Sequence, residues 1–218
     1  MSVCDPILQQ WRYCRTASAD ATVLPDGCRD LIIRVTPDGR SSLELCALDD
    51  RTRKVHLTAG ECLIGLRLRP GASVPASVLR QLRMEFATGD DHERMQMRLL
   101  DAIHTHVRLN EEPIAAILET TSVRAAARQL GVSPRTLHRY LVSATGRAPS
   151  FWFDLARARR ALAGLATQAD LASIAFLSGY ADQAHMTRSF RHRFGHTPGR
   201  FRKNEALMRL AAHPGLSG

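Results

Sequence analysis

The second half of the chain contains a repeated segment, and no other feature of the sequence constrains the fold as strongly. Residues 133–149 recur as residues 182–198, a shift of 49 positions. Equivalent positions keep their chemical character: Ser133 pairs with Asp182, Leu137 with Met186, Arg139 with Arg188, Leu141 with Phe190, Gly146 with Gly195, and Pro149 with Pro198. An internal repeat of this length indicates one supersecondary unit that is used twice.

The first copy has the pattern of a helix-turn-helix. A helix is predicted over residues 123–130, and it ends at Gly131, which can adopt the positive φ angle of a tight turn. Ser133 is suited to cap a second helix over residues 134–144. Leucines four positions apart form the buried face of that second helix, and its remaining arc carries basic side chains.

The second copy follows the same pattern, and a longer helix joins the two copies. Asp170 and Asp182 are suited to cap helices over residues 171–177 and 183–194, with a glycine in the turn between them. The joining helix is predicted over residues 151–165, where apolar residues at helical spacing form a continuous stripe. We expect this helix to fix the relative orientation of the two copies.

The first half of the chain shows short strands separated by turns. The Pro-Asp-Gly sequences at residues 25–27 and 37–39 predict turns. Strands are predicted nearby, over residues 31–35, 42–48, 55–57 and 62–68. Such spacing is typical of an antiparallel sheet or a small barrel. Residues 1–20 fit a short strand and an amphipathic helix equally well.

Two helices are predicted after the strands. The first covers residues 78–86. The second carries an apolar face made of Met95, Leu99, Ile103 and Val107. This face fits a coupling or dimerisation segment and ordinary packing against the sheet equally well.

Together these patterns predict an α+β fold with two domains. Residues 1–88 are expected to form a small β-rich sensor or regulatory domain that also contains helices. Residues 89–111 form a helical coupling segment, and residues 112–205 an all-α domain of two helix-turn-helix units joined by a linker helix. Residues 206–218 are expected to be a disordered tail.

The charge of the chain is concentrated in the repeat. The formal net charge is +9, yet residues 1–119 contain 15 Lys and Arg against 17 Asp and Glu. Residues 120–203 contain 14 basic residues against 3 acidic ones. A near-neutral domain joined to a strongly basic one is typical of a protein with a polyanion-binding module. A merely solvated basic face is the alternative, and the coincidence of the charge with the repeat weighs against it.

All five cysteines lie in the first 62 residues: Cys4, Cys14, Cys28, Cys46 and Cys62. No two of them have Cys-x-x-Cys spacing, which weighs against a closed zinc site. A disulfide framework would be unusual in the cytosol. We therefore expect small core residues, with reactive or metal-binding thiols as the alternative.

The sequence predicts no membrane span, signal peptide or catalytic motif. It has no apolar run long enough to cross a bilayer, and residues 1–10 lack a basic start followed by an apolar run. We find no nucleophile elbow, P-loop or Rossmann glycine motif. We therefore expect a cytoplasmic protein that is not an enzyme and holds no cofactor or metal.

The two copies resemble the C-terminal signature of AraC/XylS-type transcriptional regulators. In the second copy the resemblance rests on Ala175, Gly179-Tyr180, Asp182, Arg188, Phe190, Phe194-Gly195, Thr197-Pro198 and Phe201-Arg202. In the first copy and the linking helix it rests on Ala127, Gly131, Ser133, Leu137, Arg139, Gly146, Arg157 and Ala161. The resemblance covers residues 113–203. The first half is similar, less specifically, to the N-terminal region of some regulators of this family.

The resemblance implies a bacterial transcription regulator, such as an activator, that recognises a specific DNA sequence. Such a protein places its two recognition helices in successive turns of the major groove on one side of the duplex. The implied DNA contacts are Arg135, His138 and Arg139 in the first helix, and Gln183, Thr187, Arg188 and Arg191 in the second. Arginine can pair bidentately with guanine, and glutamine with adenine. His138 stands where glutamine is common in the family, and Ala184 has no side chain that can hydrogen-bond a base. The preferred sequence therefore cannot be transferred from a relative.

The expected partners are double-stranded promoter or operator DNA, a small-molecule effector of the first domain, RNA polymerase and a second copy of the chain. No membrane partner is expected. The alternative function is a DNA-directed repair or thiol- and metal-sensing protein that uses the N-terminal cysteines, since some family relatives join a reactive, zinc-bound cysteine to such a module. A nonspecific nucleic-acid packaging protein is a third hypothesis.

Overall fold

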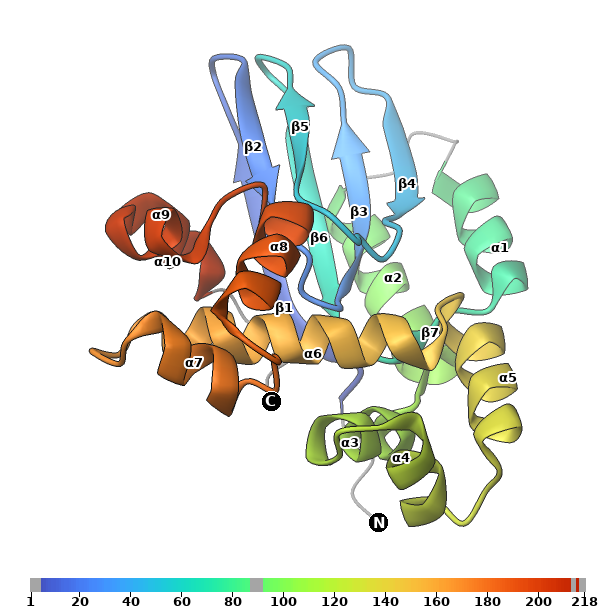
Figure 1. Cartoon of the computed structure of the whole chain (residues 1–218). Coiled ribbons are helices and arrows are strands. Elements are labelled where there is room, and N and C mark those ends of the chain that lie inside the picture. The colour runs from blue at the N-terminus through green and yellow to red at the C-terminus, as the bar shows by residue number, and fades with distance from the viewer. Residues whose placement is uncertain (1–4, 87–91, 213–214, 216–218) are drawn as a thin grey trace. The chain divides into compact units, whose positions relative to one another are not determined.

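The computed structural model describes residues 5–86, 92–212 and 215, and these form two compact units (Figure 1). The described residues of the first unit fall within 1–22, 28–48 and 54–110. Those of the second unit fall within 23–27, 49–53 and 111–218. The second unit therefore includes two short segments from the first half of the chain.

The first unit contains a four-stranded antiparallel sheet. Its strands lie in the order β1 (Ile7–Cys14), β6 (Cys62–Leu68), β3 (Arg29–Val35) and β4 (Ser41–Leu45). Two smaller pairs are β2 (Ala19–Val23) with β5 (Arg53–Leu57), and β7 (Ala72–Ser73) with β8 (Arg108–Leu109). Of the two interpretations of the N-terminal segment, the strand is the one observed.

Helices α1 (Ala76–Phe86) and α2 (His92–His106) bury their apolar faces against this sheet. The register sets Leu31 opposite Leu66 and Ile33 opposite Ile64, and all four side chains are buried. The helices contribute Leu82, Phe86, Met95, Leu99 and Ile103 to the same core. The apolar face of α2 therefore serves core packing, which was one of the two interpretations from the sequence.

Trp11 of β1 lies over Gly65 of the neighbouring strand β6. The two residues are register partners, and a Cβ atom at Gly65 would lie 2.0 Å from Cε2 of the indole ring. The indole Nε1 donates a hydrogen bond to Oδ1 of Asp30 at 2.9 Å. The ring contact explains why a glycine occupies the middle of this strand.

Cys14 and Cys62 form a disulfide, so the prediction that the cysteines are small core residues was wrong for this pair. They are register partners on β1 and β6, and their Cα atoms are 4.3 Å apart. Cys14 is exposed and Cys62 is half-buried. Cys28 is buried, as predicted, and Cys46 is half-buried. Cys4 lies outside the described residues.

The second unit consists mainly of helices, arranged along the long helix α6 (Figure 1). The first helix-turn-helix is α4 (Val123–Gln129) with α5 (Pro134–Thr145), and the second is α7 (Leu171–Leu177) with α8 (Gln183–Phe194). The remaining helices are α3 (Glu111–Glu119), α6 (Pro149–Gly164), α9 (Pro198–Lys203) and α10 (Glu205–Ala211). The predicted α+β fold, with a β-rich part followed by a double helix-turn-helix, is confirmed.

The core of the second helix-turn-helix includes a residue from far away in the sequence. Helices α6 to α9 contribute a cluster that includes Leu162, Met186, Phe190 and Phe201. Leu24, in the short segment 23–27, belongs to the same cluster and is 6% exposed. The first half of the chain thus contributes to the packing of the helical unit.

The C-terminal part continues as a helix where the sequence predicted a disordered tail from residue 206. Asn204 caps α10 by accepting a hydrogen bond from the backbone N–H of Leu207 at 3.1 Å. Leu207 and Leu210 pack against the core of the second unit, which gives this helix an apolar contact. The predicted boundary at residues 88–89 lies outside the described residues. None of the described helices is long and apolar enough to cross a membrane.

Candidate nucleic-acid interface

Helix α5 presents a basic face because its local sequence fixes both ends and its buried side. The Ser133 hydroxyl accepts a hydrogen bond from the Thr136 N–H at 3.1 Å, and Gly146 ends the helix in the left-handed conformation. Leu137 and Leu141 are buried beneath the helix. The opposite side is therefore exposed to solvent.

The three side chains predicted to contact DNA from α5 lie together on this exposed side. Arg135, His138 and Arg139 are all exposed, and with Val142 and Ser143 they line one shallow hollow. The spacing i, i+3, i+4 explains why they share a face. Two guanidinium groups and an imidazole on one helix face can contact base edges and phosphates.

Helix α8 is organised in the same way. Asp182 caps it by accepting from the His185 N–H at 2.6 Å. Met186 and Phe190 anchor it in the core, as predicted. Gly195 ends the helix in the left-handed conformation. The two helices are therefore capped, anchored in the core and terminated by residues at equivalent positions.

The predicted contact residues of α8 are accessible to different degrees. Gln183, Arg188 and Arg191 are exposed. Thr187 is half-buried, and its hydroxyl donates to the Gln183 carbonyl oxygen at 2.9 Å. The hydroxyl oxygen keeps its capacity to accept a hydrogen bond, so Thr187 can still contact a donor on a base.

Helix α6 connects the two recognition helices through buried side chains. At its start, the Trp152 indole donates from Nε1 to the Thr145 hydroxyl at the end of α5, at 3.3 Å. Farther along, Ala158 and Leu162 belong to the core around α8. With 16 residues, α6 is ~24 Å long at a rise of about 1.5 Å per residue. A rigid spacer of this kind fixes the separation of two helix-turn-helix units.

A cleft of about 670 Å³ runs along the face of α8 that carries Arg188. Its cationic lining comes from Arg147, Arg157, Arg188, Arg193, His185 and His192. Among the residues that the structure describes, the carboxylates of Asp50 and Asp154 line it as well. With neutral histidines the lining still has a positive formal charge, so the cleft is suited to an anion.

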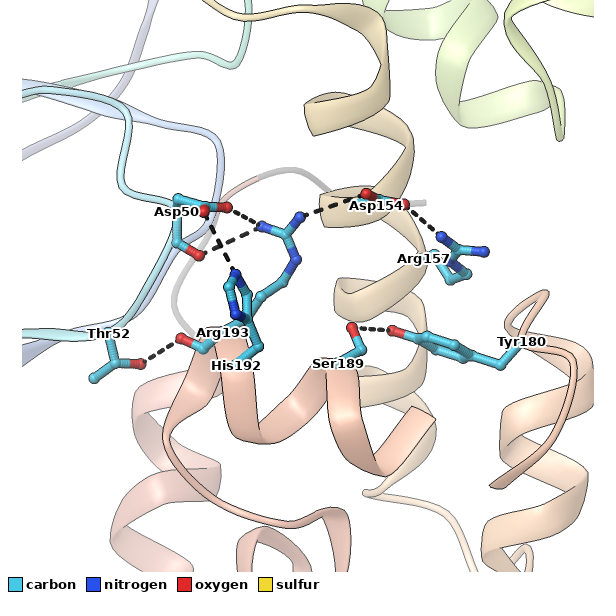
Figure 2. A network of polar contacts seen from close by, with 8 residues as sticks. All are labelled: Asp50, Thr52, Asp154, Arg157, Tyr180, Ser189, His192 and Arg193. Atoms are coloured by element: carbon cyan, nitrogen blue, oxygen red, sulfur yellow. Dashed lines mark hydrogen bonds and ion pairs between the residues drawn. The ribbon is translucent and has the colours of Figure 1, made fainter. Parts of the chain in front are cut away.

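A network of polar contacts crosses this cleft (Figure 2). Arg193 is 6% exposed, and its Nη1 donates to Oδ1 of Asp50 at 2.8 Å, while its Nη2 lies 4.0 Å from Oδ2 of Asp154. Asp154 also pairs with Arg157, whose guanidinium carbon lies 5.1 Å from the centre of the Tyr180 ring. The network therefore links segment 49–53, α6, α8 and the turn before α8.

Tyr180 forms the last part of this network. Its hydroxyl hydrogen-bonds the Ser189 hydroxyl of α8 at 3.0 Å. Burial raises the pKa of the Tyr180 phenol above its ordinary value, so the side chain stays neutral. The turn of the second helix-turn-helix is thus fastened to both α6 and α8.

Sequence reasoning missed the buried arginine of α8 and its acidic partner. Arg193 is seven positions after Met186 and three after Phe190, so helical periodicity does place it on the buried face. A buried guanidinium needs an acidic partner, and that signal was available. Asp50 had no such signal, because its contact with α8 spans 143 positions.

The cysteines do not form a metal centre in the part of the chain that the structure describes. Among those residues, no group of three or more His, Cys, Asp or Glu side chains is placed to hold a metal ion. Two of the four described cysteines are joined to each other. These observations do not favour the metal-sensing or repair alternative.

The comparisons with known proteins agree with the geometry. A family model described as a helix-turn-helix domain matches residues 126–204. The HTH-type transcriptional regulator RipA of Corynebacterium glutamicum is 35% identical over 96 residues, which cover 44% of this chain and 29% of RipA. The transcriptional activator NphR of a Rhodococcus species is 37% identical over 94 residues, which cover 42% of this chain and 26% of NphR. The match thus spans less than a third of either relative.

Among solved structures, one described as a transcriptional regulator with an AraC-type DNA-binding domain, from Chromobacterium violaceum, is 29% identical. The alignment covers 47% of this chain and 87% of that one, with a TM-score of 0.37. The family match, the two relatives and the double motif all concern the same C-terminal region. This region of the chain therefore carries a helix-turn-helix domain and is similar to transcriptional regulators of the AraC type.

Proposed function

We propose that this protein is a sequence-specific regulator of transcription that binds double-stranded DNA with α5 and α8. The observation that carries the proposal is the pair of exposed basic faces on equivalent helices, joined by the single helix α6. The two relatives, one a transcriptional regulator and the other a transcriptional activator, support it. We take residues 112–205 as the DNA-binding domain, and such a function places the protein in the bacterial cytoplasm with the DNA.

We assign different roles to the exposed side chains. Arg139 and Arg188 occupy equivalent positions and are proposed to contact base edges, where bidentate pairing with guanine gives specificity. Arg135, His138, Gln183 and Thr187 are proposed as further contacts in the grooves. Arg191, nearer the end of α8, is proposed to contact phosphate, which positions the protein without selecting a sequence.

The first unit is proposed to control DNA binding rather than to take part in it. Residues 1–22, 28–48 and 54–110 contain 13 Lys and Arg against 11 Asp and Glu, so this unit lacks the strong positive charge of residues 120–203. We propose that this unit binds a small molecule or a second copy of itself, and that the DNA-bound protein contacts RNA polymerase. Sedimentation of the full chain with and without candidate metabolites tests the first part.

Selection of bound sites from random duplex DNA tests the proposed function. The full chain should enrich one sequence with two half-sites, and it should prefer that duplex to scrambled DNA at moderate salt. Equal binding to all duplexes would instead support a nonspecific packaging protein. Absence of binding would refute both hypotheses.

A further inference from the structure

A short segment of the first half of the chain is held on the last turn of α8. We name residues 49–53 the docked segment. Thr52 donates two hydrogen bonds to the Arg193 carbonyl oxygen, from its backbone N–H at 2.7 Å and from its hydroxyl at 3.0 Å. The carbonyls of the last helical turn lack partners within the helix. The docked segment therefore fills a hydrogen-bonding vacancy at the end of α8.

The docked segment also brings a carboxylate into the cationic cleft. Asp50 Oδ1 accepts from Arg193 Nη1 at 2.8 Å, and its Oδ2 lies 3.6 Å from His192 Nε2 (Figure 2). The Asp50 side chain is 41% exposed, so it is not locked into the core. A carboxylate that is paired yet accessible can be displaced by an anion that binds the same cationic side chains more tightly.

The position of this carboxylate matters because His192 and Arg188 are one helical turn apart on α8, and both line the cleft. A recognition helix in the major groove has a phosphate backbone on each side, and cationic side chains beside the base-contacting residues bind it. A phosphate next to a base contacted by Arg188 would come close to His192 and Asp50. A carboxylate and a phosphate cannot both occupy this cleft without like-charge repulsion.

We propose that the docked segment is an internal competitor of DNA, with the Asp50 carboxylate in the place of a backbone phosphate. DNA binding then requires that Asp50 leave Arg193 and His192, and whatever holds or releases the segment regulates affinity. The inference rests on the proposed function, since it requires α8 to enter the major groove.

The first test compares two isosteric substitutions that change the net charge equally. Asp50→Asn removes the carboxylate from the cleft. Asp38→Asn is the matched control, because Asp38 lies in the turn between β3 and β4, outside the docked segment, and does not line the cleft. Affinity of the full chain for its selected duplex is measured by fluorescence anisotropy over a range of salt concentrations.

We expect Asp50→Asn to bind about tenfold more tightly, the size of effect that one charge-assisted hydrogen bond produces. Its salt dependence should stay close to that of the wild type, because the same phosphate is neutralised in both complexes once Asp50 has left. Asp38→Asn should stay within about twofold of the wild type. Equal effects of the two substitutions, or weaker binding by Asp50→Asn, would overturn the inference.

The second test uses the unaltered protein and therefore does not depend on how a variant folds. Hydrogen exchange at the Thr52 amide is followed by NMR in the free protein and with saturating duplex. Exchange should accelerate on binding, while the Cys46 amide, bonded to the Asp30 carbonyl at 2.9 Å in the first unit, should not change. A Thr52 amide that stays protected in the complex would rule out displacement.

These tests separate the inference from the proposed function. If the wild type prefers a selected duplex but neither Thr52 exchange nor Asp50→Asn behaves as stated, only the competitor role is refuted. If the wild type prefers no duplex, the proposed function is refuted, and the competitor role with it.

Discussion

Thr145 joins α5 to α6, and its replacement tests how the recognition helix is held. The residue is 2% exposed, and its hydroxyl donates to the Leu141 carbonyl at 2.7 Å. The same oxygen accepts from Trp152 Nε1 at 3.3 Å and from the Arg147 N–H at 3.2 Å. Thr145→Val keeps the volume of the side chain and removes all three bonds.

The expected loss of stability follows from the burial of the two N–H donors that Thr145 accepts from. The Trp152 side chain is fully buried, so its N–H loses its partner without access to water, at a cost of about 1–3 kcal/mol. The Arg147 N–H is part-buried, so the loss of its acceptor costs less. We expect Thr145→Val to lower the free energy of unfolding by about 2–3 kcal/mol, a large part of the stability of an ordinary domain.

Thr145→Ser is the matched control, because it keeps the hydroxyl and removes only a buried methyl group, worth about 1 kcal/mol. The free energy of unfolding is measured by urea titration of each variant, with the slope checked for constancy. If Thr145→Val is as stable as the wild type, or no less stable than Thr145→Ser, then the hydroxyl does not hold this junction.

Three further predictions concern the DNA interface and the sheet. Arg188→Ala should lower the free energy of binding to the selected site by about 1–3 kcal/mol and relax the preference at one base pair. Arg191→Ala should weaken binding to all sequences alike and lower the salt slope by about one. A uniform loss for Arg188→Ala, measured on single-base variants of the site, would contradict its assignment. Inserting about half a helical turn, ~5 base pairs, between the half-sites should reduce affinity to that of one half-site, because α6 fixes the distance between the two recognition helices. Unchanged affinity in a titration would argue against simultaneous binding of both helices to the duplex. Gly65→Ala should destabilise the first unit by about 1–3 kcal/mol, because the new Cβ meets the Trp11 ring. In a double-mutant cycle, the loss should be smaller when Trp11 is also replaced by alanine.

The helical unit was predictable because its signals are local. Caps such as Ser133 and Asp182, and the leucines and aromatics four positions apart, specify each helix within a single turn or two. The repeat then specifies the pairing of the helices. For the same reason the sequence placed the exposed basic residues of α5 on one face, which is how the structure has them.

What the sequence could not predict depends on contacts between distant residues. The pairing of Cys14 with Cys62 follows from the register of β1 and β6, and a register shift of one residue would have separated them. The docking of Asp50 on α8 likewise leaves no signal in the local sequence, because nothing in either segment indicates that it contacts the other.

The place of Leu24 in the helical core has a consequence for synthesis of the protein. Leu24 leaves the ribosome 177 positions before Phe201, a member of the same cluster. At about 5–20 residues per second, the leucine waits about 10–35 seconds for the helices that will cover it. Until then the nascent chain exposes an apolar side chain that the first unit does not bury. Chaperone binding to ribosome-bound chains should therefore persist until translation passes α9.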